Sequence, residues 1–118
     1  MMIEGDAKRV TVYIGEADRW HHKPLHTAIV EMLRAEGCAG ATVVKGVEGF
    51  GKASRIHTAS VLRLSQDLPV IVTLVDTPER VERVLPKIDE MVGGGLVVVE
   101  DVHVRRYVCP QDAGSETG

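Results

Sequence analysis

The chain has 118 residues, of which 44% are hydrophobic and 26% are charged, and its formal net charge is −3. This composition is typical of one globular domain that buries a core without disulfides, and it argues against a disordered chain. The mild acidity disfavours general binding to nucleic acids, which depends on basic surface, so we expect no nucleic-acid partner.

The sequence shows no feature that directs a chain into or across a membrane. Glu4 and Asp6 stand where a secretory signal needs positive charge, and no run approaches the roughly 20 apolar residues of a membrane span. Cys38 and Cys109 form neither a CxxC pair nor a disulfide framework. We therefore expect a soluble, cytoplasmic protein that does not insert into a membrane, although it can still dock onto a membrane protein.

The first half of the chain predicts two strands around one helix. Apolar residues alternate with polar ones in the first strand and recur at helical spacing in the helix that follows it. Pro24 suits the helix start, and Gly37 is placed to form a left-handed cap at its end. The expected segments are a frayed N-terminus (1–7), a strand (8–14), a helix (24–37) and a strand (41–47).

The second half begins with a long segment, 48–68, that lacks periodicity and is expected to be a functional or mobile loop. Thr77-Pro78 caps the start of a helix, which Pro86 is expected to kink and three consecutive glycines end. The other expected segments are strands at 69–76, 96–99 and 102–108, the last two either separate or continuous, and a disordered tail at 109–118.

This order of elements, β-α-β-β-α-β, is the ferredoxin-like arrangement of an α+β protein, and we expect it to form one domain over 8–108. Right-handed crossovers place both helices on one face of an antiparallel sheet. The strands at 69–76 and 96–99 carry apolar residues on both sides, as strands buried on both faces do. We therefore expect an oligomer that covers the second face; the alternative is a half-exposed sheet with a few surface valines.

Three features favour an anionic ligand, and each has a purely structural alternative. Gly93-Gly94-Gly95 can expose backbone N–H groups to an anion, or it can simply end a helix. The stretch 45–64 carries four basic residues against one acidic residue, which suits an anionic ligand, an acidic partner or only a solvated face. Arg105 and Arg106 point to opposite sides of a strand, so one can meet a ligand while the other pairs with a carboxylate such as Asp101, or both are edge charges.

Histidines and an indole offer a second kind of chemistry. His22 and His26 are four residues apart at a helix start, a spacing at which two imidazoles can share a metal; surface histidines are the alternative. Trp20 either packs in the core or offers a stacking surface for a base. No GxSxG motif, P-loop or local cysteine–histidine signature is present, so we expect no enzyme. The candidates for a third metal ligand are Glu16, Asp18, His21, His57 and His103.

Two glycine-rich stretches resemble the PII-like signalling superfamily. GCAGATVVKGVEGFG (37–51) is similar to the segment that leads into the T-loop of that family, and GGGLVVVEDVHVRRY (93–107) is similar to its B-loop and last core strand. Within the superfamily, residues 8–107 resemble an uncharacterised branch, the domain-of-unknown-function one-ninety family. The phrases that carry this likeness are Tyr13-Ile14-Gly15-Glu16, Arg19-Trp20-His21, Lys23-Pro24-Leu25, Gly49-Phe50-Gly51, Arg55-Ile56-His57 and Leu68-Pro69-Val70.

The resemblance implies a ferredoxin-like homotrimer that binds adenine nucleotides in the clefts between subunits and contacts a transporter, an enzyme or a regulator through its T-loop. The sequence departs from the family at Leu96, where PII proteins have a lysine that contacts phosphate, and segment 48–68 lacks the tyrosine of some T-loops. The ligand-binding candidates that match the family are Gly49, Phe50, Gly51 and Lys52 at the T-loop base, Gly93, Gly94 and Gly95 in the B-loop, and Arg105 and Arg106 after it.

The leading hypothesis is a non-catalytic regulatory protein. A small anionic ligand, such as an adenine nucleotide, would bind between subunits and order the basic loop for a target protein. One alternative is a metal-binding trimer of the same architecture, similar to copper-tolerance proteins, which would use His21, His22 and His26. The other alternative is a purely structural docking subunit whose loop responds to no ligand.

Overall fold

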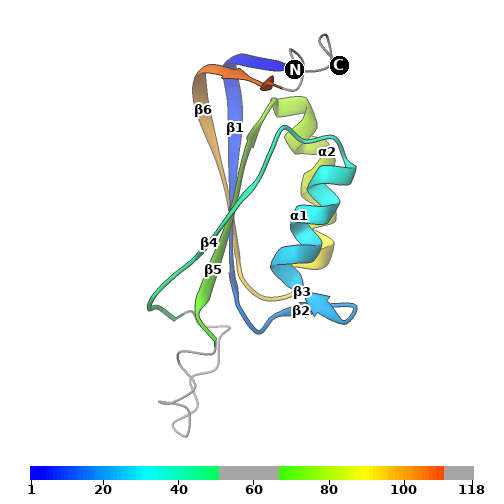
Figure 1. The fold of residues 1–118 in the computed structure, drawn as a ribbon, viewed down its shortest axis with the longest axis vertical. Helices are drawn as coiled ribbons and strands as arrows, with labels where there is room; N and C mark the ends of the chain where they lie inside the picture. The colour runs from blue at the N-terminus through cyan, green and yellow to red at the C-terminus, as the bar shows by residue number, and fades with distance from the viewer. Residues whose placement is uncertain (51–66, 111–118) are drawn as a thin grey trace, which may run out of the picture.

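The computed structural model describes residues 1–50 and 67–110, in which two helices pack on one face of a four-stranded antiparallel sheet (Figure 1). The strand order is β4-β5-β1-β6, and every neighbouring pair is antiparallel. This is the expected ferredoxin-like α+β fold. The strands of the sheet are β1 (Met2–Gly15), β4 (Thr42–Lys45), β5 (Pro69–Asp76) and β6 (Leu96–Val108); β2 (Arg19–Trp20) and β3 (Lys23–Pro24) form a small hairpin, and the helices are α1 (Leu25–Ala35) and α2 (Pro78–Met91).

The N-terminal residues that we expected to be frayed, 1–7, are paired instead. Strand β1 begins at Met2, which lies opposite Val108 of β6, and Ile3 and Ala7 are buried. Gly5, with φ of 95°, lies at a register shift that interrupts the alternation of apolar residues, so the sequence pattern alone does not indicate a strand there. The two strands expected at 96–99 and 102–108 likewise form the single strand β6.

The helices begin and end close to the expected residues. Pro24 is the N-cap of α1, one position before its first helical residue, and Gly37 has the expected left-handed φ, 81°. At the start of α2, the Thr77 hydroxyl accepts a hydrogen bond from the Arg80 N–H at 3.3 Å. Helix α2 continues through Pro86. Neither helix in the described residues has the length and apolarity needed to cross a bilayer.

The core lies between the helices and one face of the sheet. Alternate residues of the two central strands point into it, and each such aliphatic side chain contributes about 1.5–3 kcal/mol by leaving water. The fully or nearly fully buried core residues are Val10, Val12, Ile14, Leu25, Ile29, Leu33, Val70, Val72, Leu74, Val81, Val84 and Ile88.

A buried carboxylate joins three segments at one end of this core. Asp76 is 0% exposed, and its oxygens accept hydrogen bonds from the Ala39 N–H at 2.8 Å and from the Thr77 N–H at 2.7 Å. The Arg80 guanidinium completes the set with an ion pair at 2.9 Å. The end of β5, the start of α2 and the segment before β4 are therefore held by one side chain.

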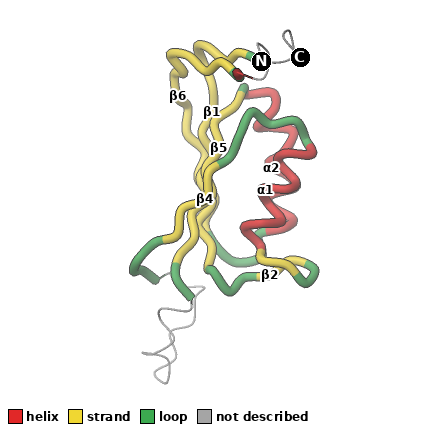
Figure 2. Tube along the Cα trace, in the orientation of Figure 1, coloured by secondary structure: helices red, strands yellow, loops and turns green. Residues whose placement is uncertain are grey.

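One end of the sheet face opposite the helices is apolar. Tyr13 lies opposite Ile71 of β5 and Leu96 of β6, and Val44 of β4 lies opposite Ile71 as well, so these four side chains share that face. Tyr13 is 41% exposed, Val44 53% and Leu96 55%. In Figure 2 both helices cover the other face, and no other described element covers this one. We call this apolar surface the open face.

Candidate functional site

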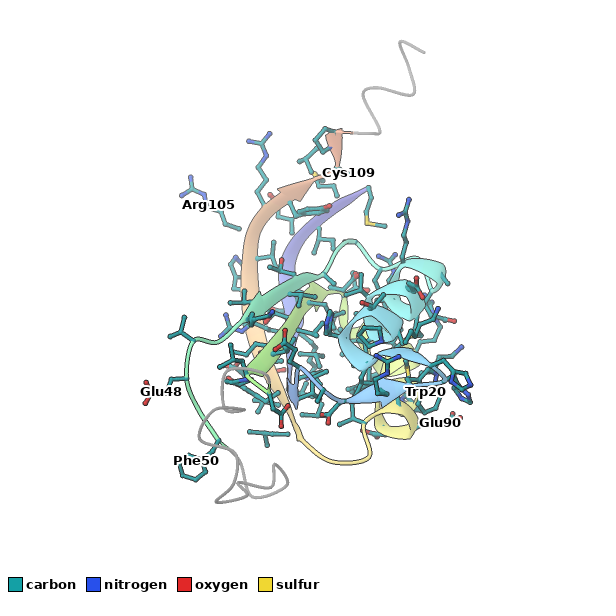
Figure 3. All side chains as sticks on the ribbon, turned by 60° about the horizontal axis from the view of Figure 1, so that its bottom comes forward. Trp20, Glu48, Phe50, Glu90, Arg105 and Cys109 are labelled. Atoms are coloured by element: carbon teal, nitrogen blue, oxygen red, sulfur yellow. The ribbon has the colours of Figure 1, made fainter. Side chains whose placement is uncertain are left out.

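The two groups of ligand-binding candidates on β6 lie at opposite ends of that strand. Gly93–Gly95 precede Leu96, whose partner Tyr13 is near the end of β1, whereas Arg105 follows Val104, whose partner is Gly5 near the beginning of β1. Arg105 lies nine positions after Leu96, which corresponds to about 30 Å along a strand. Figure 3 shows Arg105 far from Phe50. One copy of the chain therefore does not bring these candidates together.

The three glycines of this turn are not equivalent. A Cβ at Gly95 would lie 2.6 Å from the Tyr13 carbonyl oxygen, and its φ of 151° disfavours other residues, so packing against β1 explains this glycine. A Cβ at Gly93 would meet nothing within 4 Å. The plain-turn interpretation therefore accounts for Gly95, whereas neither packing nor a left-handed φ requires a glycine at position 93.

Arg105 and Arg106 are exposed, and neither side chain has an ion pair or hydrogen bond to another described residue. The expected pairing with Asp101 is wrong, because Lys8 occupies that carboxylate, at 2.5 Å. The Asp101 carboxylate raises the pKa of Lys8, first through its hydrogen bond and then through its charge. The arginines at the end of β6 thus remain available to an anion.

The base of segment 46–68 is tied to the turn that follows β1. The Glu16 carboxylate forms an ion pair with Lys45 at the end of β4, and its backbone N–H donates to the Leu68 carbonyl at 2.8 Å. The hydrogen bond from Lys45 is the main cause of a lowered pKa at Glu16. Asp67 accepts the Ala17 N–H at 3.2 Å. Sequence reasoning missed these anchors, because nothing in the sequence links an acidic turn to strand ends so distant along the chain.

The T-loop candidates are described only in part. Gly49 and Phe50 lie just beyond β4, where Phe50 is 80% exposed, while Gly51 and Lys52 lie outside the described residues. A Cβ at Gly49 would lie 3.1 Å from the Pro69 ring, so close approach to the start of β5 accounts for that glycine. Phe50, in contrast, is an apolar side chain presented to solvent.

The histidine candidates do not form one metal site. His21 and His22 occupy the turn of the β2–β3 hairpin, and His26 lies in the first turn of α1. Within 1–50 and 67–110, no group of three histidine, cysteine or acidic side chains is arranged to hold a metal. His57 lies outside these ranges. The four-residue spacing of His22 and His26 was misleading because the helix begins only at Leu25, so the two histidines do not share a helical face.

Cys38 is a poor candidate for a catalytic nucleophile. Burial, and then the nearby Asp76 carboxylate, raise the pKa of its thiol, which disfavours the reactive thiolate. No catalytic group was expected here, and the described surroundings of Cys38 give it no activating base.

Trp20 packs against the core and also borders a groove. The groove, of about 390 Å³, lies between the β2–β3 hairpin and the two helices. The His21 ring meets the Trp20 ring edge-on, with centroids 4.5 Å apart. Figure 3 shows Trp20 on the helix side of the molecule, away from Glu48 and Phe50. The core-packing interpretation of Trp20 is therefore right for part of the ring, although sequence reasoning missed the groove beside it.

Comparisons with known proteins agree with this architecture. Residues 7–104 match the model of the DUF190 family, described as "Uncharacterized ACR". The UPF0166 protein MJ1524 of Methanocaldococcus jannaschii is 38% identical over 99 residues, which cover 83% of this chain and 91% of that protein.

Two solved structures share the fold. The putative PII-like signaling protein TTHA0516 of Thermus thermophilus superposes with a TM-score of 0.59 at 20% identity, over 88% of this chain and 92% of that one. CPII of Thiomonas intermedia K12 is a nitrogen regulatory PII-like protein whose structure is bound to ADP, AMP and bicarbonate. It superposes with a TM-score of 0.58 at 17% identity, over 92% of this chain and 100% of that one. The chain therefore belongs to the DUF190 family and has the ferredoxin-like fold of PII-like proteins.

Proposed function

We propose that this protein is a non-catalytic, PII-like regulator of the cytoplasm. In this proposal it binds a small anionic ligand, an adenine nucleotide, in clefts between identical copies and reports the bound state to a target protein through segment 46–68. CPII, which has the same fold, binds ADP, AMP and bicarbonate, and this supports the choice of ligand.

Association of copies is the first step of the proposal. The open face presents Tyr13, Val44 and Leu96 to solvent, and burial of such a surface between copies is favourable by about 25 cal/mol for each Å² of apolar area. We propose a homotrimer. The exposed apolar residues of the open face are the observation that carries this proposal. Gly93 and Arg105 lie at opposite ends of β6, so a cleft that contains both requires a second copy.

The ligand would meet backbone N–H groups at Gly93 and guanidinium groups at Arg105 and Arg106. Each charge-assisted hydrogen bond from an arginine to a phosphate contributes about 1.5–3 kcal/mol. Leu96 supplies no charge beside the glycines. The arginines therefore carry most of the phosphate recognition, and a nucleotide with fewer phosphates remains a suitable ligand.

The target would be contacted by segment 46–68, as the T-loop does in the family. Its described base is joined to the turn after β1 by contacts of Glu16, Lys45 and Asp67, and in this proposal these contacts link the segment to that turn. Phe50, at 80% exposure, is an apolar anchor for a protein surface. We propose a protein target, a transporter or a regulator, rather than a nucleic acid.

Isothermal titration calorimetry of ADP and AMP against the full chain tests the proposal. We expect binding to the native protein and a loss of about tenfold to hundredfold in affinity in Arg105→Ala, the equivalent of one charge-assisted hydrogen bond. Arg34→Ala is the matched control, because the Arg34 side chain is also exposed and has no partner among the described residues but lies on α1. An absence of heat with every adenine nucleotide, or equal losses in both variants, would contradict the proposal and favour the purely structural docking subunit.

A further inference from the structure

The groove between the β2–β3 hairpin and the helices gathers an unusual set of side chains. Met32 of α1, Met91 at the end of α2, and Trp20 and His21 of the hairpin all line it. Two thioethers, an imidazole and an indole thus border one hollow of about 390 Å³. The only methionines elsewhere in the chain are Met1 and Met2, at the start of β1.

The fold fixes three of these four groups and leaves the fourth at the surface. Trp20, Met32 and Met91 are half-buried and pack against the core. His21 is exposed in the hairpin turn, where it and His22 have φ of 46° and 73°. A two-residue hairpin turn favours such angles, usually with Asn-Gly, and histidine is among the few other residues that adopt them readily. The turn holds the His21 ring edge-on to Trp20, and both side chains line the groove.

The chemistry of the groove suits a soft cation and disfavours a hard one. Thioether sulfur and imidazole nitrogen are neutral donors that select Cu(I) and similar ions, whereas magnesium and calcium require several oxygen ligands. The two charged residues that line the groove, Lys23 and Glu31, form an ion pair with each other at 2.7 Å, so neither leaves an uncompensated charge beside the donors. The electron-rich face of an indole also attracts a cation within about 6 Å.

We propose that this groove is a binding site for a soft monovalent metal ion, Cu(I) or Ag(I), with Met32, Met91 and His21 as ligands and Trp20 beside the ion. The site uses none of the residues assigned to the nucleotide cleft, so it can be tested independently of the proposed function. Two of its three donors are methionines, so the site differs in chemistry from the clusters of histidine, cysteine and acidic residues that hold zinc. Packing alone would need only apolar volume at both methionines, and leucine supplies that volume.

Titration with Ag⁺ followed by fluorescence tests the site, because Trp20 is the only tryptophan of the chain. Both cysteines are replaced by serine in all proteins of this series, since thiolates bind soft metals strongly. We expect one equivalent of Ag⁺ to change Trp20 emission, and Met32→Leu and Met91→Leu each to weaken binding by about tenfold or more, since loss of even an outer-shell partner costs that much. The matched controls are Met2→Leu and His22→Asn, which change no proposed ligand. His21→Asn is a third test variant: it removes the imidazole of a proposed ligand, while asparagine remains suited to the turn.

A second measurement uses the native chain and does not depend on the serine replacements. With ¹³C-labelled methionine methyl groups, one equivalent of Ag⁺ beyond that taken up by the thiols is expected to shift the signals of Met32 and Met91 but not that of Met2. Binding that survives unchanged in Met32→Leu/Met91→Leu, an unperturbed pair of methyl signals, or equal competition by Zn²⁺ would overturn the proposal.

Discussion

Replacement of Asp76 by alanine is expected to cost far more stability than replacement of any exposed acid. The change removes the acceptor of two backbone N–H groups, those of Ala39 and Thr77, and the counter-ion of Arg80. Each buried donor left without a partner costs about 1–3 kcal/mol, whereas Arg80 is 26% exposed and can turn to water. The expected loss is therefore about 3–5 kcal/mol, the usual cost of breaking a buried ion pair. Asp76→Asn keeps one oxygen acceptor and should lose about half as much.

The assay is urea unfolding at a fixed protein concentration, because association contributes to the apparent stability of an oligomer. Asp89→Ala is the matched control, since Asp89 is an exposed acid of α2, and its effect is expected to stay within about 0.5 kcal/mol. A loss below about 1 kcal/mol in Asp76→Ala would refute the assignment of Asp76 as the residue that holds this end of the core.

Three further predictions concern the glycine turn, an ion pair and the open face. Gly95→Ala should lower the melting temperature, because its Cβ would meet the Tyr13 carbonyl oxygen at 2.6 Å, whereas Gly93→Ala should leave it unchanged; equal melting temperatures would contradict this difference. Two cations of α2 lower the pKa of Glu36, first Lys87, through its hydrogen bond, and then Arg83. The ionised Glu36 therefore stabilises the fold above the ordinary pKa of 4.5, and this stabilisation is lost as pH falls through the lowered pKa. Glu36→Gln should therefore have a lower urea midpoint than the native chain at pH 7 and the same midpoint in strong acid. A difference between the two midpoints that persists in acid would contradict this. Leu96→Asp should give a folded single copy by sedimentation, since it charges an exposed part of the open face; an intact oligomer would exclude Leu96 from the interface.

The elements whose beginning or end is marked by their own residues, or by residues next to them, could be predicted from the sequence. Strand β5 matches its predicted range, 69–76, because an almost continuous run of apolar and β-branched residues lies between Pro69 and Pro78. The start of α2 follows from the Thr77 hydroxyl and Pro78, and the end of α1 follows from Gly37. Each of these signals is local, so a single sequence is sufficient to read it.

The features that depend on distant residues could not be predicted. The beginning of β1 is a strand only because it pairs with the end of β6, and the bulge at Gly5 hides the pattern. Strands β2 and β3 have two residues each, too few for any periodicity. Burial of Asp76 and the presence of Met32 and Met91 in one groove depend on how the helices pack, about which spacing along the chain says nothing. The distance between Gly95 and Arg105 results from β6 being one continuous strand. The sequence left open whether this stretch forms one strand or two.

The central claim, that one binding cleft is built from two copies of the chain, is tested most directly by mixing two inactive variants. Arg105→Ala/Arg106→Ala removes the cationic half of the cleft, and Gly93→Val blocks the backbone half at a position where the fold leaves open space. We predict that neither variant binds ADP alone, and that co-assembly of equal amounts restores about a quarter of the sites, as random mixing in a cyclic trimer requires. Mixed assemblies that form but restore no binding would contradict the account.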